Sequence, residues 1–404
     1  MAKRMAYKGQ IIKQLFFTAH LSCSDLSSQI NKSLPFINGL LSELIEDGVV
    51  VETGYAPSSG GRRPLMYSLK TGILYVLAVA MDQFVTRIAL MDMHNRHITD
   101  LVKFDLNLAE EKDALAKLTE KIQEVIQNTK IQKDHITGIG IGMPGFVNAR
   151  TGINYTFLKN GNKGITTYIS EHTGLPVFID NDSSLVALAE FRFGAASKRK
   201  NAMVVNLGWG IGLGMVLDEK LFRGNNGFAG EFSHIPLFTN GKLCSCGKHG
   251  CLETESSLLI VTERARQGVA EGKLSLLKEL VTNESAEKDC AAVFDAAGKG
   301  DRFAVSLISD AGYVVGRGLA ILIHIINPEV IILSGRGAAA GKIWLPPIQQ
   351  ALNEHCIPKL ADSTELEISE LAYEAEIVGA AALVMENYEK VFLKKNLKTD
   401  LITA

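Results

Sequence analysis

The sequence predicts a two-lobed α/β protein that carries a small helical domain with a β-wing at its N-terminus. Residues 1–72 contain three helical patterns and then a turn-rich hairpin. Residues 73–404 alternate apolar strands with amphipathic helices, and two similar openings of strand and glycine turn indicate duplicated lobes. At 404 residues and 47% hydrophobic composition, the chain is long enough for two or three domains with their own cores.

The charge balance excludes a protein that coats polyanions over its whole surface. The chain has 42 basic and 44 acidic residues, which gives a formal net charge of -2. Residues 1–72 hold eight Lys or Arg against five acids. We therefore expect any contact with nucleic acid to be confined to this N-terminal segment.

Cysteine usage and the start of the chain predict a soluble, cytoplasmic protein. Three of the six cysteines lie close together in Cys244–Cys251, which is more typical of metal ligation than of a secreted disulfide framework. Lys8 and Lys13 interrupt the early apolar residues, so no signal peptide is expected. No uncharged apolar run reaches the roughly 20 residues that span a bilayer, and no membrane segment is expected.

Three helices are predicted in the N-terminal segment. The first covers Gln10–Phe17, where apolar residues recur at helical spacing, and the second covers Ser24–Ile30. The third follows a candidate N-cap at Ser33, has Pro35 in its first turn and ends at Asp47-Gly48.

The two strands Val49–Glu52 and Pro64–Leu69 complete the order of a winged helix-turn-helix domain, with operator DNA as its partner. The third helix of this motif enters the major groove, and a basic turn in the wing can reach a narrow minor groove. Phosphates would be bound just before that helix. The predicted DNA-binding residues are Lys32, Ser33, Phe36, Asn38, Ser42, Arg62 and Arg63. A small dimerisation or docking module is the alternative.

The remaining chain is divided into a first lobe of about 73–185 with the C-terminal helix 377–390, and a second lobe of about 186–376. The hairpin Ile73–Ala80 and Val85–Met91 opens the first lobe. The strand Met203–Leu207 and a glycine turn through Gly214 repeat this opening. Other expected elements are a helix around Leu115–Ile126, strands Ile136–Ile141 and Val177–Asp180, and helices Ser183–Phe193 and Val305–Ile326. Strand Val330–Leu333, helix Ile343–Leu352, strand Leu366–Ser369 and helix Ile377–Tyr388 complete the alternation.

The strongest local signal is a set of metal ligands. One imidazole and three thiolates form a closed tetrahedral zinc site, which serves structure because no coordination position is left open. The predicted ligands are His234, Cys244, Cys246 and Cys251. A Cys244–Cys251 disulfide and a site in which His249 replaces His234 are the alternatives.

Three carboxylates lie near this cluster or near a strand end. Asp182 follows a predicted strand, Glu231 precedes His234 by three residues, and Glu253 follows the last cysteine by two. Sugar hydroxyls can donate to such oxygens and accept from an amide such as that of Asn181. The pattern therefore favours a polyhydroxylated ligand, held between the lobes.

Along almost its whole length, the chain resembles the ROK family of bacterial repressors and sugar kinases, which share an actin-like, two-lobed sugar-kinase fold. The family's glycine-rich signature is similar to Leu207–Gly230 with Ala229–His234, where Ser233 replaces the usual glycine, and its cysteine signature is similar to Cys244–Glu253. Its Asn-Asp pair resembles Asn181-Asp182. The resemblance implies that the sugar contacts are Asn181, Asp182, Glu231, His234 and Glu253, with zinc orienting His234.

The phosphate-binding loop departs from the pattern of ROK kinases. These kinases carry Asp-x-Gly-Gly-Thr in the first hairpin, where this chain has Asp82-Gln83-Phe84-Val85-Thr86. Bulky side chains fill the volume that a phosphate needs, and Trp209 does the same at the second phosphate turn. Phosphoryl transfer depends on positioning, so we expect no enzyme activity, although Asp182 stands at the position of the kinase base.

These expectations favour a sugar-responsive transcriptional regulator that represses carbohydrate-utilisation genes. A sugar or sugar phosphate would shift lobe closure and change the spacing of two DNA-binding domains in a homodimer or homotetramer. One alternative is an ATP-dependent ROK sugar kinase with an appended DNA-binding domain. The other is a sugar-sensing adaptor that docks a protein through residues 1–72.

Overall fold

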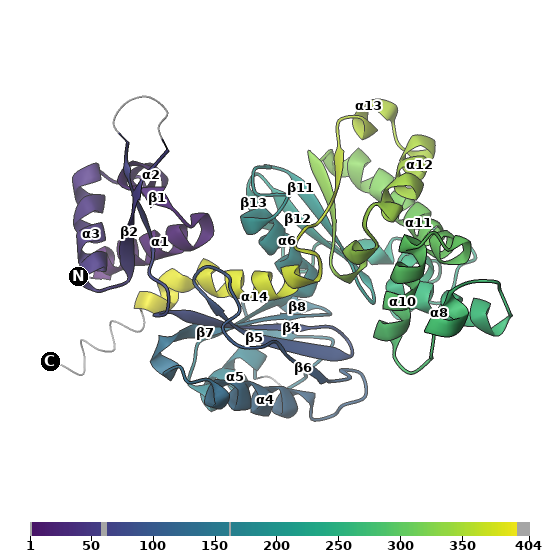
Figure 1. Cartoon of the computed structure of the whole chain (residues 1–404), viewed down its shortest axis with the longest axis horizontal. Coiled ribbons are helices and arrows are strands. Elements are labelled where there is room, and N and C mark those ends of the chain that lie inside the picture. The colour runs from purple at the N-terminus through teal and green to yellow at the C-terminus, as the bar shows by residue number, and fades with distance from the viewer. Residues whose placement is uncertain (1, 58–62, 161–162, 394–404) are drawn as a thin grey trace. The chain divides into compact units, whose positions relative to one another are not determined.

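The computed structural model of the chain describes residues 2–57, 63–160 and 163–393 (Figure 1). It separates into two compact units, Met1–Asp180 with Ile377–Ala404, and Asn181–Glu376. Residues 1–72 are grouped with the first unit. The boundary between the two units lies after Asp180, a few residues before the expected position near 185. The helix that begins at Asp182 packs on a strand of the second unit and is therefore grouped with it.

The N-terminal domain combines three helices with a small sheet. Its elements are α1 (Ala2–Thr18), β1 (Leu21–Ser22), α2 (Cys23–Ile30), α3 (Leu34–Glu46), β2 (Val50–Tyr55) and β3 (Leu65–Leu69). Strand β3 pairs antiparallel with both others, in the order β1-β3-β2. Ile11, Leu26 and Leu40 are fully buried in the core that the helices share. All three predicted helices and both predicted strands are confirmed, while the two-residue strand β1 is too short to give a periodic pattern.

The rest of the first unit is built on a five-stranded sheet of order β10-β7-β4-β5-β6. These strands are β4 (Tyr75–Met81), β5 (Val85–Asp92), β6 (Val102–Asp105), β7 (Ile136–Met143) and β10 (Val177–Asn181). Helices α4 (Ala114–Asn128) and α5 (Ile165–Thr173) cover one face, and α14 (Ala375–Glu386) covers the other (Figure 1). Any side chain at Gly140 would overlap the Ala380 carbonyl, so this glycine lets α14 lie directly on β7.

The second unit repeats this sheet, with strand order β13-β12-β11-β14-β15. Its strands are β11 (Ala202–Leu207), β12 (Ile211–Leu217), β13 (Lys220–Phe222), β14 (Val330–Ser334) and β15 (Glu365–Ile368). In both sheets an antiparallel three-strand meander is extended by a strand parallel to its first strand. The repeated pattern confirms the predicted duplication.

Helices surround the second sheet and form the rest of this unit. They are α6 (Asp182–Phe193), η2 (Phe232–His234), α7 (Glu253–Ser256), α8 (Leu258–Ala270), α9 (Leu277–Leu280), α10 (Ala286–Gly298), α11 (Arg302–Ile326), η3 (Arg336–Trp344), α12 (Leu345–His355), α13 (Pro358–Ala361) and η4 (Ala372–Glu374). Within the described residues, α11 alone has the length and apolar composition of a membrane span. It packs on α12, and 61% of its most apolar window is buried, as in the core helix of a globular unit.

The glycine turn predicted through Gly214 is shorter in the structure, because β12 already begins at Ile211. Gly212 and Gly214 therefore lie inside a strand. A side chain at Gly212 would overlap Ser183, and one at Gly214 would overlap Ala187. These glycines are needed for the close packing of α6 across β12, and the tight turn is confined to residues 208–210.

Candidate functional site

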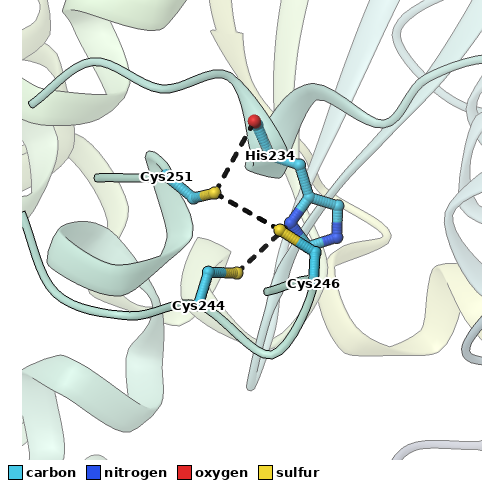
Figure 2. Close-up of side chains that lie close together, drawn as sticks. All are labelled: His234, Cys244, Cys246 and Cys251. Carbon is cyan, nitrogen blue, oxygen red and sulfur yellow. Dashed lines mark hydrogen bonds between the residues drawn. The ribbon is translucent and has the colours of Figure 1, made fainter. Parts of the chain in front are cut away.

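The four predicted metal ligands lie together in the second unit. The ligand atoms of His234, Cys244, Cys246 and Cys251 all lie within 4.8 Å of one another (Figure 2). The Cys246 and Cys251 Sγ atoms are 3.6 Å apart, and Cys244 Sγ lies 3.4 Å from His234 Nδ1. Tetrahedral zinc with Zn–S bonds of about 2.3 Å requires ligand separations of about 3.5–3.8 Å. The donor set and its spacing therefore fit one tetrahedral ion.

Backbone pairing holds these ligands in place. Leu252 N–H donates to the Ile235 carbonyl (2.9 Å), and Leu237 N–H donates to the Gly250 carbonyl (2.8 Å). Gly250 has a φ of +76° and leaves no room for a side chain beside the Phe238 carbonyl. The chain therefore turns back sharply just before its last cysteine and brings it beside His234.

Both alternatives to this ligand set lose support. Cys244 and Cys251 are both free thiols, so the structure does not contain the alternative disulfide between them. His249 lies outside the cluster, and its Nδ1 contacts the Gly241 carbonyl at 3.2 Å. The cluster thus consists of the predicted His and three Cys.

The electrostatics of the thiols favour a bound cation. Burial raises the pKa of Cys251 to about 12, and the neighbouring sulfurs add to this shift. The backbone N–H of Lys248 lowers the pKa of the exposed Cys246 thiol. Three thiolates this close repel one another, so their joint ionisation requires a compensating positive charge such as a metal ion.

The three carboxylates, Asp182, Glu231 and Glu253, lie near the beginning of β12, either in contact with it or next to a residue that is. Glu253 begins α7, and its Oε2 accepts a hydrogen bond from the Ile211 N–H (3.3 Å). A side chain at Gly210 would come within 2.5 Å of the same oxygen. The tight turn before β12 therefore allows Glu253 to approach the backbone closely.

Asp182 is the first residue of α6, the helix that packs on β12. The Asn181 side chain caps this helix by accepting from the N–H groups of Ser183 and Ser184. Asp182 Oδ1 accepts from the Ser183 N–H (2.7 Å), and Ser183 lies against Gly212. The cap thus fixes Asp182 beside the strand.

Glu231 lies one residue after a close backbone contact with β12. The preceding Gly230 lies against the Leu213 carbonyl, and Glu231 Oε2 lies 3.7 Å from His234 Nε2. Partial burial raises the pKa of Glu231; the His234 charge lowers it, and the charges of Asp182 and Glu253 raise it further. The three carboxylates are therefore within electrostatic reach of one another, and His234 presents one ring nitrogen to the sulfurs and the other to Glu231.

Arg336 was missed as a site residue by sequence reasoning. Its guanidinium group lies 4.7 Å from the Trp209 ring centroid and 4.2 Å from that of Tyr373. It also bonds to Glu287 (2.8 Å) and to the Tyr373 hydroxyl. The only sequence signal was its place in the turn Ser334-Gly335-Arg336-Gly337, where an arginine replaces a small residue in a glycine-rich setting.

Residues 82–86 of the first unit form a self-capped turn. Asp82 Oδ1 accepts from the N–H groups of Phe84 and Val85, each at 2.8 Å. The Leu108 N–H donates to the Gln83 carbonyl (3.0 Å). These backbone groups are therefore engaged within the protein itself. Elsewhere in this unit, Asn160 Nδ2 is buried without a hydrogen-bond partner among the described residues, and no role was predicted for this residue.

The predicted DNA-binding residues lie on and just before α3. Lys32, Ser33, Asn38 and Ser42 are exposed. Phe36 is partly buried and packs edge-on against Tyr7 of α1, with ring centroids 5.4 Å apart, so it is less available to bases than its neighbours. Arg63 is exposed, whereas Arg62 lies outside the described residues.

Comparisons with known proteins give one family and two kinds of relative. The family profile described as "ROK family" matches residues 87–387. The xylose repressor of Caldicellulosiruptor bescii is 28% identical over 93% of this chain and 94% of its own length. The glucokinase of Halalkalibacterium halodurans is 36% identical, but over 63% of this chain and 78% of its own length.

Among solved structures, a ROK family transcriptional regulator described as a homologue of the Escherichia coli MLC protein superposes with a TM-score of 0.78. It is 29% identical and covers 98% of this chain and 99% of its own. This likeness confirms the expected sugar-kinase type of fold.

Proposed function

Because this chain belongs to the ROK family, we propose that it is a sugar-responsive transcriptional repressor. The observation that carries the proposal is the share of this chain with which each relative aligns. The xylose repressor aligns with 93% of the chain and the ROK regulator structure with 98%, whereas the glucokinase aligns with 63%. A relative that extends over the N-terminal domain supports a function that uses this domain.

The N-terminal domain is proposed to bind operator DNA as a winged helix-turn-helix. Its element order, three helices followed by a β-hairpin, is that of this motif. Helix α3 would enter the major groove with Asn38 and Ser42, while Lys32 and Ser33 would bind phosphates. Each domain offers few contacts, so a homodimer or homotetramer on a palindromic site would supply useful affinity. Such a protein would act in the cytoplasm.

The effector is proposed to be a sugar or sugar phosphate bound by Asn181, His234 and the three carboxylates. Carboxylate oxygens accept from sugar hydroxyls, and the Asn181 amide can donate to them. Zinc would be held by His234 and the three cysteines of the cluster, where it would supply a structural cross-link and not reaction chemistry. This cross-link would fix the loop that carries His234 and bring Glu253 to the carboxylate group.

A sugar kinase is the second candidate, and Asp182 is the residue that favours it. Three bulky residues argue against a kinase. Phe84 and Val85 stand in the first hairpin and Trp209 in the second turn, at positions where phosphate loops require small residues. We propose that the ATP-dependent activity is absent.

One set of assays on the full chain tests the proposal. The protein should bind duplex DNA from the region upstream of its own gene, and one of D-xylose, D-glucose, N-acetylglucosamine or their phosphates should weaken that binding. Substituting Arg62 and Arg63 by alanine should weaken binding uniformly across sequences and reduce its salt dependence. Sugar-dependent ATP turnover at the 1–100 s⁻¹ typical of kinases, without DNA binding, would support the kinase instead.

A further inference from the structure

Arg336 stands between the carboxylate site and the beginning of α14. Its side chain is only 11% exposed. The guanidinium group lies near the rings of Trp209 and Tyr373 and pairs with the Glu287 carboxylate. An arginine can stack on rings and hydrogen-bond at the edge of its plane at the same time, which lysine cannot do. Arg336 therefore ties Trp209 to Tyr373 in a defined geometry.

The first half of this connection leads to the carboxylates. Trp209 lies in the turn that is closed by the Gly208 N–H donating to the Gly210 carbonyl (2.9 Å). The next residue, Ile211, donates to Glu253 at 3.3 Å, a long hydrogen bond for an amide and a carboxylate. A sugar hydroxyl that donates to Glu253 would compete with this weak bond. Ligand binding would then shift the turn that positions Trp209.

The second half leads to α14. Tyr373 belongs to η4, and α14 follows without a break from Ala375. Helix α14 lies on β7, where Gly140 allows direct backbone approach to Ala380. A helix moves along its axis largely as a rigid rod. A shift of Tyr373 would therefore displace the C-terminal end of α14 as well.

That other end contacts the N-terminal domain. Lys13 of α1 bonds to the Glu386 carboxylate (2.9 Å) and to its carbonyl (3.2 Å). The Gln10 side chain donates to Glu389 (3.2 Å). Helix α1 is in turn joined to α3 by the ion pair of Lys8 and Asp47 at 2.8 Å. A series of contacts thus connects the carboxylate site to α3.

We propose that Arg336 is a latch that couples effector binding at Glu253 to α14 and, through Lys13, to the N-terminal domain. The proposal rests on the function proposed above. A ligand regulates only if it favours one of two arrangements, and here these are Glu253 bonded to the Ile211 N–H or to the sugar. Arg336 acts as a positioning residue. Its loss should therefore abolish the effect of sugar on DNA binding while sugar binding and DNA binding both persist.

The test measures three quantities on the full chain: sugar affinity, affinity for its own upstream DNA, and the fold-change in DNA affinity that the sugar causes. The probe is whichever of D-xylose, D-glucose and N-acetylglucosamine, or of their phosphates, raises the melting temperature. Wild type should show a fold-change in the range of about 5- to 150-fold that is typical of allosteric proteins. Arg336→Ala should keep both affinities within about threefold and reduce the fold-change to about one.

Matched variants separate the latch from general damage. Arg302→Ala removes an exposed arginine from the same unit and should behave as wild type. Arg336→Lys keeps the charge beside Glu287 but loses the planar stack, and should weaken coupling while folding normally. Lys13→Ala should also uncouple, whereas Lys3→Ala on the same helix should not.

The outcomes are distinguishable. Full wild-type coupling in Arg336→Ala, or in a folded Arg336→Lys if the alanine variant does not fold, would overturn the latch and leave the proposed function standing. A wild-type protein that binds no sugar, or whose DNA binding ignores sugar, would overturn both.

Discussion

At the scale of single residues, the second unit places negative charge where it also holds its thiols. Glu253 accepts from the Ile211 N–H at the start of β12, and Asp182 and Glu231 each adjoin a residue that packs on this strand. His234 lies between Glu231 and Cys244. Such an arrangement is costly for the fold, because like charges repel when partly desolvated. Its benefit is a set of acceptors that a polyhydroxylated ligand can satisfy, which is consistent with a binding site.

Glu253→Gln tests the role of this charge. The amide keeps the shape and an oxygen for the Ile211 N–H, but it is a weaker acceptor for a sugar hydroxyl. We expect sugar affinity to fall about 10- to 150-fold, the equivalent of losing a charge-assisted hydrogen bond of about 1.5–3 kcal/mol. Calorimetric titration measures the change, and Glu263→Gln, an exposed position on α8, is the control. Unchanged affinity in Glu253→Gln would remove this carboxylate from the site.

Cys246→Ala tests the metal cluster. Because three ligands hold zinc less tightly than four, the variant should lose zinc on dialysis against a mild chelator while wild type retains it. Metal content and melting temperature are the measurements. Ser245→Ala changes the adjacent exposed residue and should retain the metal. Equal zinc retention by both variants would argue against ligation by Cys246.

Asp92 predicts how the stability of the first unit depends on pH. Burial alone would raise the pKa of Asp92, but hydrogen bonds from Arg96 and from the His94 N–H outweigh burial and lower it. A carboxyl with a lowered pKa stabilises the folded state above the pKa it has in the unfolded chain, and this contribution is lost as pH falls through the folded value.

Asp92→Asn should therefore cost roughly 1–3 kcal/mol at pH 7 and progressively less in acid. Denaturant unfolding of the two proteins at pH 7 and below pH 4 gives both differences. If the difference in unfolding free energy between wild type and Asp92→Asn stays constant or grows in acid, the lowered pKa of Asp92 is contradicted.

At the scale of elements, patterns of local spacing were sufficient for much of the fold. Helices α2 and α3 and strands β4, β5 and β11 were predicted close to their observed bounds. Helix α1 begins eight residues before its predicted start, and the short strands β6 and β13 were not predicted. Helices α5, α8 and α10 were not predicted, since charged and small residues interrupt their apolar stripes. The end of the glycine turn was misplaced because Gly212 serves packing between α6 and β12, a tertiary contact that local spacing does not reveal.

The same distinction holds for the candidate site. His234, Cys244, Cys246 and Cys251 lie in one stretch of the chain and have a recognisable spacing, so the sequence predicted that they cluster. Arg336, Trp209 and Tyr373 come from three distant segments, and only the folded chain brings them into contact. Phe36 was assigned to the DNA-facing side from helical spacing alone, before its contact with Tyr7 could be known.

Gly212→Ala tests the packing of α6 on β12. The added methyl group would overlap Ser183 and displace the helix start that carries Asp182. We expect a loss of about 1–3 kcal/mol in stability, as for overpacked sites, together with weaker sugar binding. Gly298→Ala, in a helix with open space around it, should be neutral or stabilising by about 0.5–1 kcal/mol. Chemical denaturation measures both, and equal stability of the two variants would refute the packing argument.

At the scale of the whole molecule, we propose DNA binding at the N-terminal end of the chain and sugar binding in the second unit. Repression relieved by sugar requires that the two binding events oppose each other thermodynamically. This requirement is reciprocal: DNA must weaken sugar binding by the same factor by which sugar weakens DNA binding. A protein with two independent sites would bind both ligands and regulate nothing.

The most direct test is titration of duplex DNA from the protein's own upstream region with the full chain, with and without the sugar that raises its melting temperature. We predict salt-dependent binding that the sugar weakens about 5- to 150-fold, and the same factor when sugar affinity is measured with and without DNA. DNA affinity that is unchanged by a sugar that demonstrably binds would contradict the account.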